Sequence, residues 1–147
     1  MSDSYLDHVP SQEREKIRRR MRSPEAYEKL RERVKGPEDL EREMEKNDAM
    51  AEMHFALESD PHYHEALKKK VEEALKEKGV ENVLEDAVVS KEAKNAIEKG
   101  NFSLSVSAHP NSHIDQLVIV PEGNVQEKLP IKPSLSQQFS SQLRKSE

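Results

Sequence analysis

The chain contains no cysteine and no tryptophan, and it has few glycines and few aromatic residues. Its 147 residues include 4 Gly, 3 Phe and 3 Tyr. Without cysteine, neither a disulfide framework nor a thiolate zinc site can form. No glycine-rich loop of the phosphate-binding type occurs, so the sequence gives no sign of the nucleotide chemistry that such loops support. With so few large side chains, the hydrophobic core has to be thin.

Charged residues outnumber the apolar ones. They make up 36% of the chain against 33% for the hydrophobic residues, and the formal net charge is −5. Basic residues are in excess over 1–35, and acidic residues are in excess over 36–60. The simplest interpretation is that two antiparallel helices attract each other, with a modest contribution that salt screens. The thin core also predicts that folding depends in part on a protein partner or on self-association.

Long apolar runs are missing as well. No stretch approaches the roughly 18 to 20 consecutive apolar residues of a membrane span. The first residues lack the basic start and the apolar run of a signal peptide. We therefore expect no contact with a membrane and a cytoplasmic location.

The periodicity of the apolar residues changes at Gly100. Before it, charge-rich segments opened by Pro or Ser show a period of 3.6. After it, residues 102–107 alternate with a period of two, and 117–120, within the second predicted strand, are continuously apolar. The pattern predicts helices over 12–22, 24–35, 37–59, 61–78 and 91–99, a hairpin of 102–107 with 116–120, and an edge strand near 125–129. The fold class is α+β: four to five charged amphipathic helices followed by a small two- or three-stranded antiparallel sheet.

Three parts of the chain follow from this pattern. Residues 1–22 form a basic helical arm, whose polar start over 1–9 is expected to fray. Residues 23–132 form a helical plus β-hairpin domain. Residues 133–147 form a flexible amphipathic tail, in which a short helix is marginal on its own and orders on contact.

The helix over 37–59 offers the widest apolar surface in the chain. We interpret this surface first as core and place Phe55 in the main core. Part of it can instead serve a partner groove, because methionine adapts its shape and recurs on binding surfaces. The residues predicted to bind a partner are Ile17, Met21, Met50, Met53, Leu135, Phe139 and Leu143.

An arginine cluster lies in the predicted arm. Arginine side chains suit phosphate groups, so a contact with nucleic acid is an alternative function. The interleaved Glu13 and Glu15 and the lack of nearby aromatic residues favour a solvated or ion-paired helix. The candidate nucleic-acid residues are Arg14, Arg18, Arg19, Arg20 and Arg22.

Histidines and carboxylates concentrate between residues 54 and 64. The candidate metal ligands are His54, Glu58, His62 and His64, a sensible set for zinc or iron. Their spacing matches no metal motif, and a helix cap with surface histidines explains the same residues, so no metal and no cofactor is assigned. Ser and His also occur together over 107–113, but Asp115 is the only acid in view to orient a histidine, and no catalytic triad is predicted.

One acidic pattern resembles a known enzyme family. Glu25-x-x-Glu28 followed by Glu45-x-x-Asp48 resembles the paired acidic motifs of all-α nucleotide pyrophosphohydrolases. The resemblance implies carboxylates on two helices that hold Mg²⁺ for metal-dependent hydrolysis.

Together these patterns predict a small cytoplasmic protein-binding or regulatory module, such as an adaptor or an antitoxin-like inhibitor, and not an enzyme. It would act through helical apolar stripes, a sheet edge and a foldable tail. The alternative is a nucleic-acid-associated accessory protein that uses the arginine cluster. A pyrophosphohydrolase-like enzyme comes third.

Overall fold

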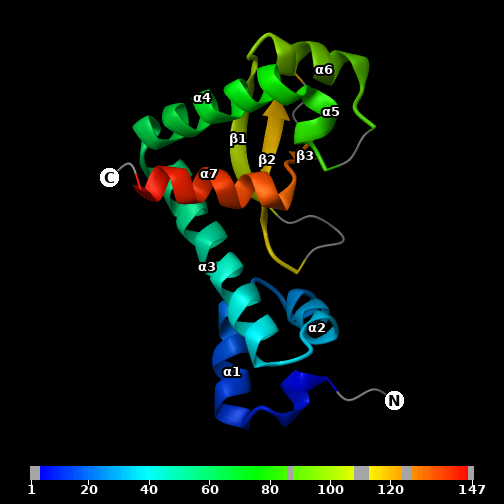
Figure 1. Cartoon of the computed structure of the whole chain (residues 1–147), viewed down its shortest axis with the longest axis vertical. Helices are drawn as coiled ribbons and strands as arrows, with labels where there is room; N and C mark the ends of the chain where they lie inside the picture. Colours follow the sequence, from blue (N-terminus) through cyan, green and yellow to red (C-terminus); the bar gives the residue numbers. More distant parts are fainter. Residues whose placement is uncertain (1–3, 86–87, 108–112, 124–126, 146–147) are drawn as a thin grey trace.

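A computed structural model of the chain describes residues 4–85, 88–107, 113–123 and 127–145, and Figure 1 shows their arrangement. The elements, in chain order, are the 3-10 helix η1 (Tyr5–His8), α1 (Ser11–Arg20), α2 (Pro24–Arg33), α3 (Pro37–Ser59), α4 (Pro61–Lys78), α5 (Val80–Val83), α6 (Lys91–Glu98), β1 (Phe102–Ser107), β2 (Gln116–Pro121), β3 (Leu129–Pro130) and α7 (Pro133–Lys145). Helices α1 to α6 precede an antiparallel sheet and α7 follows it, so the α+β class predicted from the periodicity is confirmed. No helix in the described ranges is long and apolar enough to cross a membrane.

Serine side chains cap two of the helices that the sequence predicts to begin at Ser or Pro. The Ser23 side chain accepts a hydrogen bond from the backbone N–H of Ala26 at the start of α2. The Ser90 side chain does the same for the N–H of Ala93 at the start of α6. Such bonds satisfy backbone donors that have no partner within the helix. At the end of α4, Gly79 has a φ of 89°, a left-handed conformation that glycine adopts without a steric cost.

The strands form one sheet in the order β1-β2-β3. β1 pairs antiparallel with β2, with Phe102 opposite Pro121 and Ser107 opposite Gln116. β2 is the central strand, as its continuous apolar run predicts. β3 is the predicted third strand; it is only two residues long, and residues 124–126 lie outside the described part.

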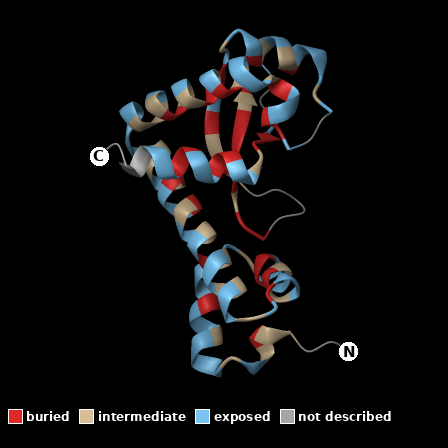
Figure 2. Ribbon diagram, in the orientation of Figure 1, coloured by how far each residue is buried: buried red, intermediate tan, exposed pale blue. Residues whose placement is uncertain are grey.

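The buried apolar side chains form two clusters (Figure 2). The main core lies among α3, α4, α5, α6, α7 and the sheet, and its fully buried members include Met53, Leu67, Ile97, Phe102, Leu117 and Ile119. The N-terminal core lies among η1, α1, α2 and the first half of α3, and consists of Leu6, Ile17, Met21, Ala26, Tyr27, Leu30, Val34 and Met44.

Helix α3 contributes to both cores with opposite faces. Met44 packs into the N-terminal core, whereas Met53 packs into the main core. These two residues are nine positions apart, about two and a half helical turns, and therefore point to opposite sides. Figure 1 shows α3 running from the N-terminal helices up to α4 and the sheet. One helix thus holds the two halves of the molecule together.

The placement of Phe55 in the main core is wrong, because its side chain is 73% exposed. Phe55 lies about three turns beyond Met44 and shares its face of α3. That face packs on α1 and α2 only near the N-terminal end of α3, and the main core takes the opposite face. Phe55 therefore lies on the same apolar face as Met44, but beyond the part of that face that α1 and α2 cover.

The two ends of the chain also differ from the sequence expectation. In the described part of 1–9, Ser4 caps η1 and the Leu6 side chain is fully buried, so the predicted fraying is wrong there. The C-terminal segment, predicted to be a flexible tail, forms α7, which packs on α3, α4 and β2. Leu135 and Phe139 are buried in the main core, so the contact that orders this helix is with its own chain.

Candidate functional site

A cavity of about 250 Å³ lies at the boundary between the two cores. Its wall is built by the end of α2, the middle of α3, the segment that leads into β2 and the first turns of α7. Because these elements come from distant parts of the sequence, the cavity exists only in the folded molecule. Its polar side chains include Glu43 and Lys46 on α3, Gln116 at the start of β2, Ser136 on α7, and His113.

His113 is the central polar residue of this cavity. Its side chain is only 3% exposed, and its Nε2 lies 2.8 Å from Glu43 Oε2. Burial lowers the pKa of His113, with a smaller lowering by the charges of Arg33 and Lys46, while the Glu43 carboxylate opposes the shift. A neutral imidazole that donates its Nε2 proton to Glu43 carries a lone pair on Nδ1. This Nδ1 is buried and has no hydrogen-bond partner.

Two other buried side chains of the cavity also have a polar atom without a partner. They are Gln116, 8% exposed, through its Oε1, and Ser136, 3% exposed, through its Oγ. A buried polar group without a hydrogen bond costs about 1 to 3 kcal/mol, so such groups are rare in native structures. Three of them on one cavity mark it as the strongest candidate for a binding site in the described part of the chain.

Two ion pairs involve residues that line the cavity. Arg22 Nε, between α1 and α2, lies 2.8 Å from Asp115 Oδ1 in the segment before β2. Lys46 Nζ lies 3.6 Å from Glu43 Oε1 within α3. The Arg22–Asp115 pair links the N-terminal helices to the segment before β2. The Glu43–His113 contact links α3 to the same segment.

The predicted partner-binding residues are buried within the chain itself. Ile17 and Met21 lie in the N-terminal core, and Leu135 and Phe139 lie in the main core. The methionines of α3 named for this role, Met50 and Met53, are in the main core too, and Met50 also lines the cavity. The Leu143 side chain is outside the described part. None of the described ones is presented at the surface of the folded chain.

The arginine cluster is largely engaged with the protein's own side chains. Arg18 pairs with Glu15 at 3.2 Å, and its guanidinium lies 4.8 Å from the ring centre of Tyr27. Arg20 forms an ion pair with Asp48 of α3. These pairs fit the predicted attraction between the basic arm and the acidic helix.

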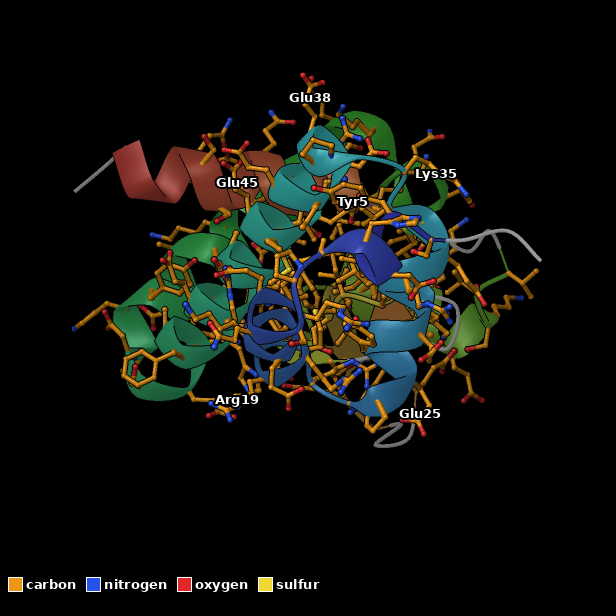
Figure 3. All side chains as sticks on the ribbon, turned by 90° about the horizontal axis from the view of Figure 1, so that it is seen from below. Tyr5, Arg19, Glu25, Lys35, Glu38 and Glu45 are labelled. Atoms are coloured by element: carbon orange, nitrogen blue, oxygen red, sulfur yellow. The ribbon has the colours of Figure 1, made fainter. Side chains whose placement is uncertain are left out.

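The remaining members of the cluster have different surroundings. Arg14 lies near Asp7 and helps to lower the pKa of that carboxyl, which is lowered chiefly by its hydrogen bonds with Arg31. Arg22 is paired with Asp115, as described above. Arg19 is exposed and lies at the edge of the molecule in Figure 3. The five arginines therefore do not form one continuous basic surface.

The candidate metal ligands have separate roles. His54 Nε2 lies 2.8 Å from Glu58 Oε1 on the surface of α3. His64 Nε2, in contrast, accepts a hydrogen bond from the backbone N–H of Leu104 at 3.1 Å, and His62 is exposed. Among the described residues, no group of three or more His, Cys, Asp or Glu is placed to hold a metal ion.

The acidic residues of the pyrophosphohydrolase pattern are not brought together either. Glu25 and Glu45 lie on opposite sides of the molecule in Figure 3. Glu28 pairs with Arg31 at 3.3 Å, and Asp48 pairs with Arg20. The arrangement that the resemblance implies, with four carboxylates around Mg²⁺, is not formed by these residues.

The cavity residues were missed by the sequence interpretation, and the reason is their separation along the chain. The carboxylate that orients His113 is Glu43, 70 residues earlier, and not the neighbouring Asp115. The only signal in the sequence was the Ser and His content of 107–113. Comparisons of the chain with protein-family models, with curated proteins and with solved structures gave no match.

Proposed function

We propose that this protein is a protein-binding or regulatory module, such as an adaptor or an inhibitor, and not an enzyme. The observation that carries the proposal is Phe55, a large aromatic side chain that is 73% exposed on the longest helix. Aromatic side chains are frequent anchors of protein interfaces, because they bury a large area at a small cost in conformational entropy. The proposed partner packs on this face of α3.

The face around Phe55 extends an apolar stripe that the N-terminal core uses. Leu40 and Met44 begin the stripe and pack with the N-terminal core, and Ala51 and Phe55 continue it with exposed side chains. A partner that packs on Ala51 and Phe55 would continue the helix packing that α1 and α2 begin. A helix with its own apolar stripe has the right shape for this position.

Charge indicates which kind of helix fits. Exposed carboxylates flank the stripe, among them Glu45, Glu52 and Glu58. A partner segment with lysine or arginine beside its apolar stripe would be complementary to them. We therefore propose a basic amphipathic helix as the segment that binds. The internal pairing of Arg18, Arg20 and Arg22 favours this proposal over nucleic-acid binding by the arginine cluster.

A pull-down from native lysate with two matched variants tests the proposal. Phe55→Ser removes the proposed anchor, and Val88→Ser changes another apolar side chain, which is 91% exposed in a loop. We expect a stoichiometric protein partner that the unchanged protein and Val88→Ser recover and that Phe55→Ser loses. Recovery should be insensitive to nuclease, and the melting temperatures of both variants should stay close to that of the unchanged protein.

Two results would contradict the proposal. Equal recovery by Phe55→Ser would mean that this face of α3 does not bind the partner. Recovery that nuclease abolishes and that falls steeply with salt would support the nucleic-acid alternative instead.

A further inference from the structure

We propose that the cavity between the two cores binds a small organic primary amine through its ammonium group. This inference is independent of the partner face, because Phe55 does not line the cavity. It rests on two kinds of observation: the hydrogen-bonding atoms that the cavity presents and the apolar part of its lining.

The partnerless atoms of the cavity match an ammonium group in number and in kind. His113 Nδ1 and Gln116 Oε1 are acceptors, and Ser136 Oγ can accept as well. An ammonium group has three N–H donors and no acceptor. A carboxylate or a phosphate has acceptors only, and would leave His113 Nδ1 and Gln116 Oε1 without a donor.

The charges of the wall are close to balanced. The carboxylates of Glu43, Glu85 and Asp115 line the cavity, against the cations of Arg33 and Lys46. Lys46 Nζ lies 3.6 Å from Glu43 Oε1, which offsets part of its charge. Asp115 is likewise offset by Arg22, whose Nε lies 2.8 Å from its Oδ1. The charges of the wall therefore nearly balance, and the choice of an ammonium group rests on the hydrogen-bonding atoms.

The cavity has room for more than an ammonium group. At about 250 Å³ it exceeds by several times the roughly 30 Å³ that one water molecule occupies in the liquid. Met50, Ile114 and Pro133 supply apolar lining. A short hydrocarbon chain attached to the amine would pack against them, and its burial would add to the affinity. The ligand class is thus a primary amine with a few carbon atoms.

A set of probes with matched chains tests this assignment. Butylamine, butanoate and butanamide share the same hydrocarbon part and differ in the polar group. NMR signals of the His113 ring report on binding to the full chain at constant pH and ionic strength. We expect butylamine to shift these signals saturably, butanamide to bind at least about fivefold more weakly, and butanoate to cause no saturable shift.

Two cavity variants and one control locate the binding site. Ser136→Ala and Gln116→Met each remove one hydrogen-bonding group and should weaken butylamine binding about fivefold, the usual effect of losing one hydrogen bond. Ser140→Ala is the control, because Ser140 is also buried on α7 but does not line the cavity. It should leave the affinity unchanged. Backbone amide spectra show whether each variant is folded.

Three results would overturn the proposal. Saturable binding of butanoate without binding of butylamine would assign the cavity to an anion. Shifts that never saturate with any of the probes would mean that water alone occupies it. Equal weakening by Ser136→Ala and by Ser140→Ala would place any butylamine binding outside this cavity. If Gln116→Met does not fold, Ser136→Ala decides alone, since serine to alanine is tolerated well in a helix.

Discussion

Burial favours the neutral form of His113, and this has a consequence for stability. A histidine in the unfolded chain titrates near pH 6.5, whereas burial lowers the pKa of His113 in the folded protein. Below about pH 6.5 the unfolded chain therefore takes up a proton that the folded protein does not. The free energy of unfolding should fall as the pH drops from about 6.5 through the folded pKa, and this contribution should be complete above 6.5.

An NMR titration of the His113 ring measures this pKa directly. We expect a midpoint below 6.5 in the unchanged protein. In Glu43→Gln the midpoint should be lower still, because the Glu43 carboxylate favours the charged imidazole. His62→Gln is the control, since His62 is exposed and lies on α4, away from the cavity lining. A midpoint above 6.5 in the unchanged protein would contradict the buried placement.

The burial of individual residues could be predicted from the sequence only where the helix that carries them packs in a single core. The sequence interpretation treats the apolar residues of α3 as one surface, but they lie on two opposite faces: Met44 packs in the N-terminal core and Met53 in the main core. Periodicity cannot show that the face of Met44 and Phe55 is covered only near the N-terminal end of α3, because the cover depends on where α1 and α2 pack. The same limit applies to the cavity, whose Glu43–His113 contact spans 70 residues.

At the scale of one element, α7 shows what a correct pattern leaves open. The i, i+4 spacing of Leu135 and Phe139 predicts the apolar face of the helix, and both side chains are buried. Whether this face packs on another molecule or on its own chain depends on tertiary contacts, which spacing does not encode. In the structure, it packs on the main core.

We expect Phe139→Ala to destabilise the main core by about 3 to 5 kcal/mol, the usual cost of truncating a buried Phe. Since a short helix is marginal without tertiary contacts, α7 should then lose its protection from hydrogen exchange before the sheet does. Gln138→Ala is the control, because Gln138 is exposed on the same helix. An unchanged melting temperature in Phe139→Ala would mean that this contact does not contribute to the fold.

At the scale of the whole molecule, two small cores share α3. The sequence predicts the elements well, because capping residues and periodicity are local signals. It does not predict the division of the buried residues into two clusters, because that follows from how the helices pack. Between the cores, the ion pair of Arg22 with Asp115 and the contact of Glu43 with His113 supplement the covalent link through α3.

This division predicts that the two cores respond separately to mutation. Leu30 and Leu117 are both fully buried, Leu30 in the N-terminal core and Leu117 in the main core. Each change to alanine should cost about 2 to 5 kcal/mol in the core that contains it. In Leu30→Ala, hydrogen exchange should rise in α1, α2 and the first half of α3, and β1 and β2 should keep their protection. In Leu117→Ala, protection should be lost in the sheet and α7.

Uniform loss of protection in Leu30→Ala would contradict this prediction and would show that the chain unfolds as one cooperative unit. The cavity offers a second readout of the same variant. Glu43 lies in the first half of α3, so loosening of the N-terminal core should release its contact with His113. Loss of the Glu43 contact lowers the pKa of His113, whereas hydration of the ring raises it. Because burial is the larger cause of the shift, the pKa should rise toward its ordinary value. Separate cores thus predict that Leu30→Ala alters the cavity while the β1–β2 hairpin stays intact.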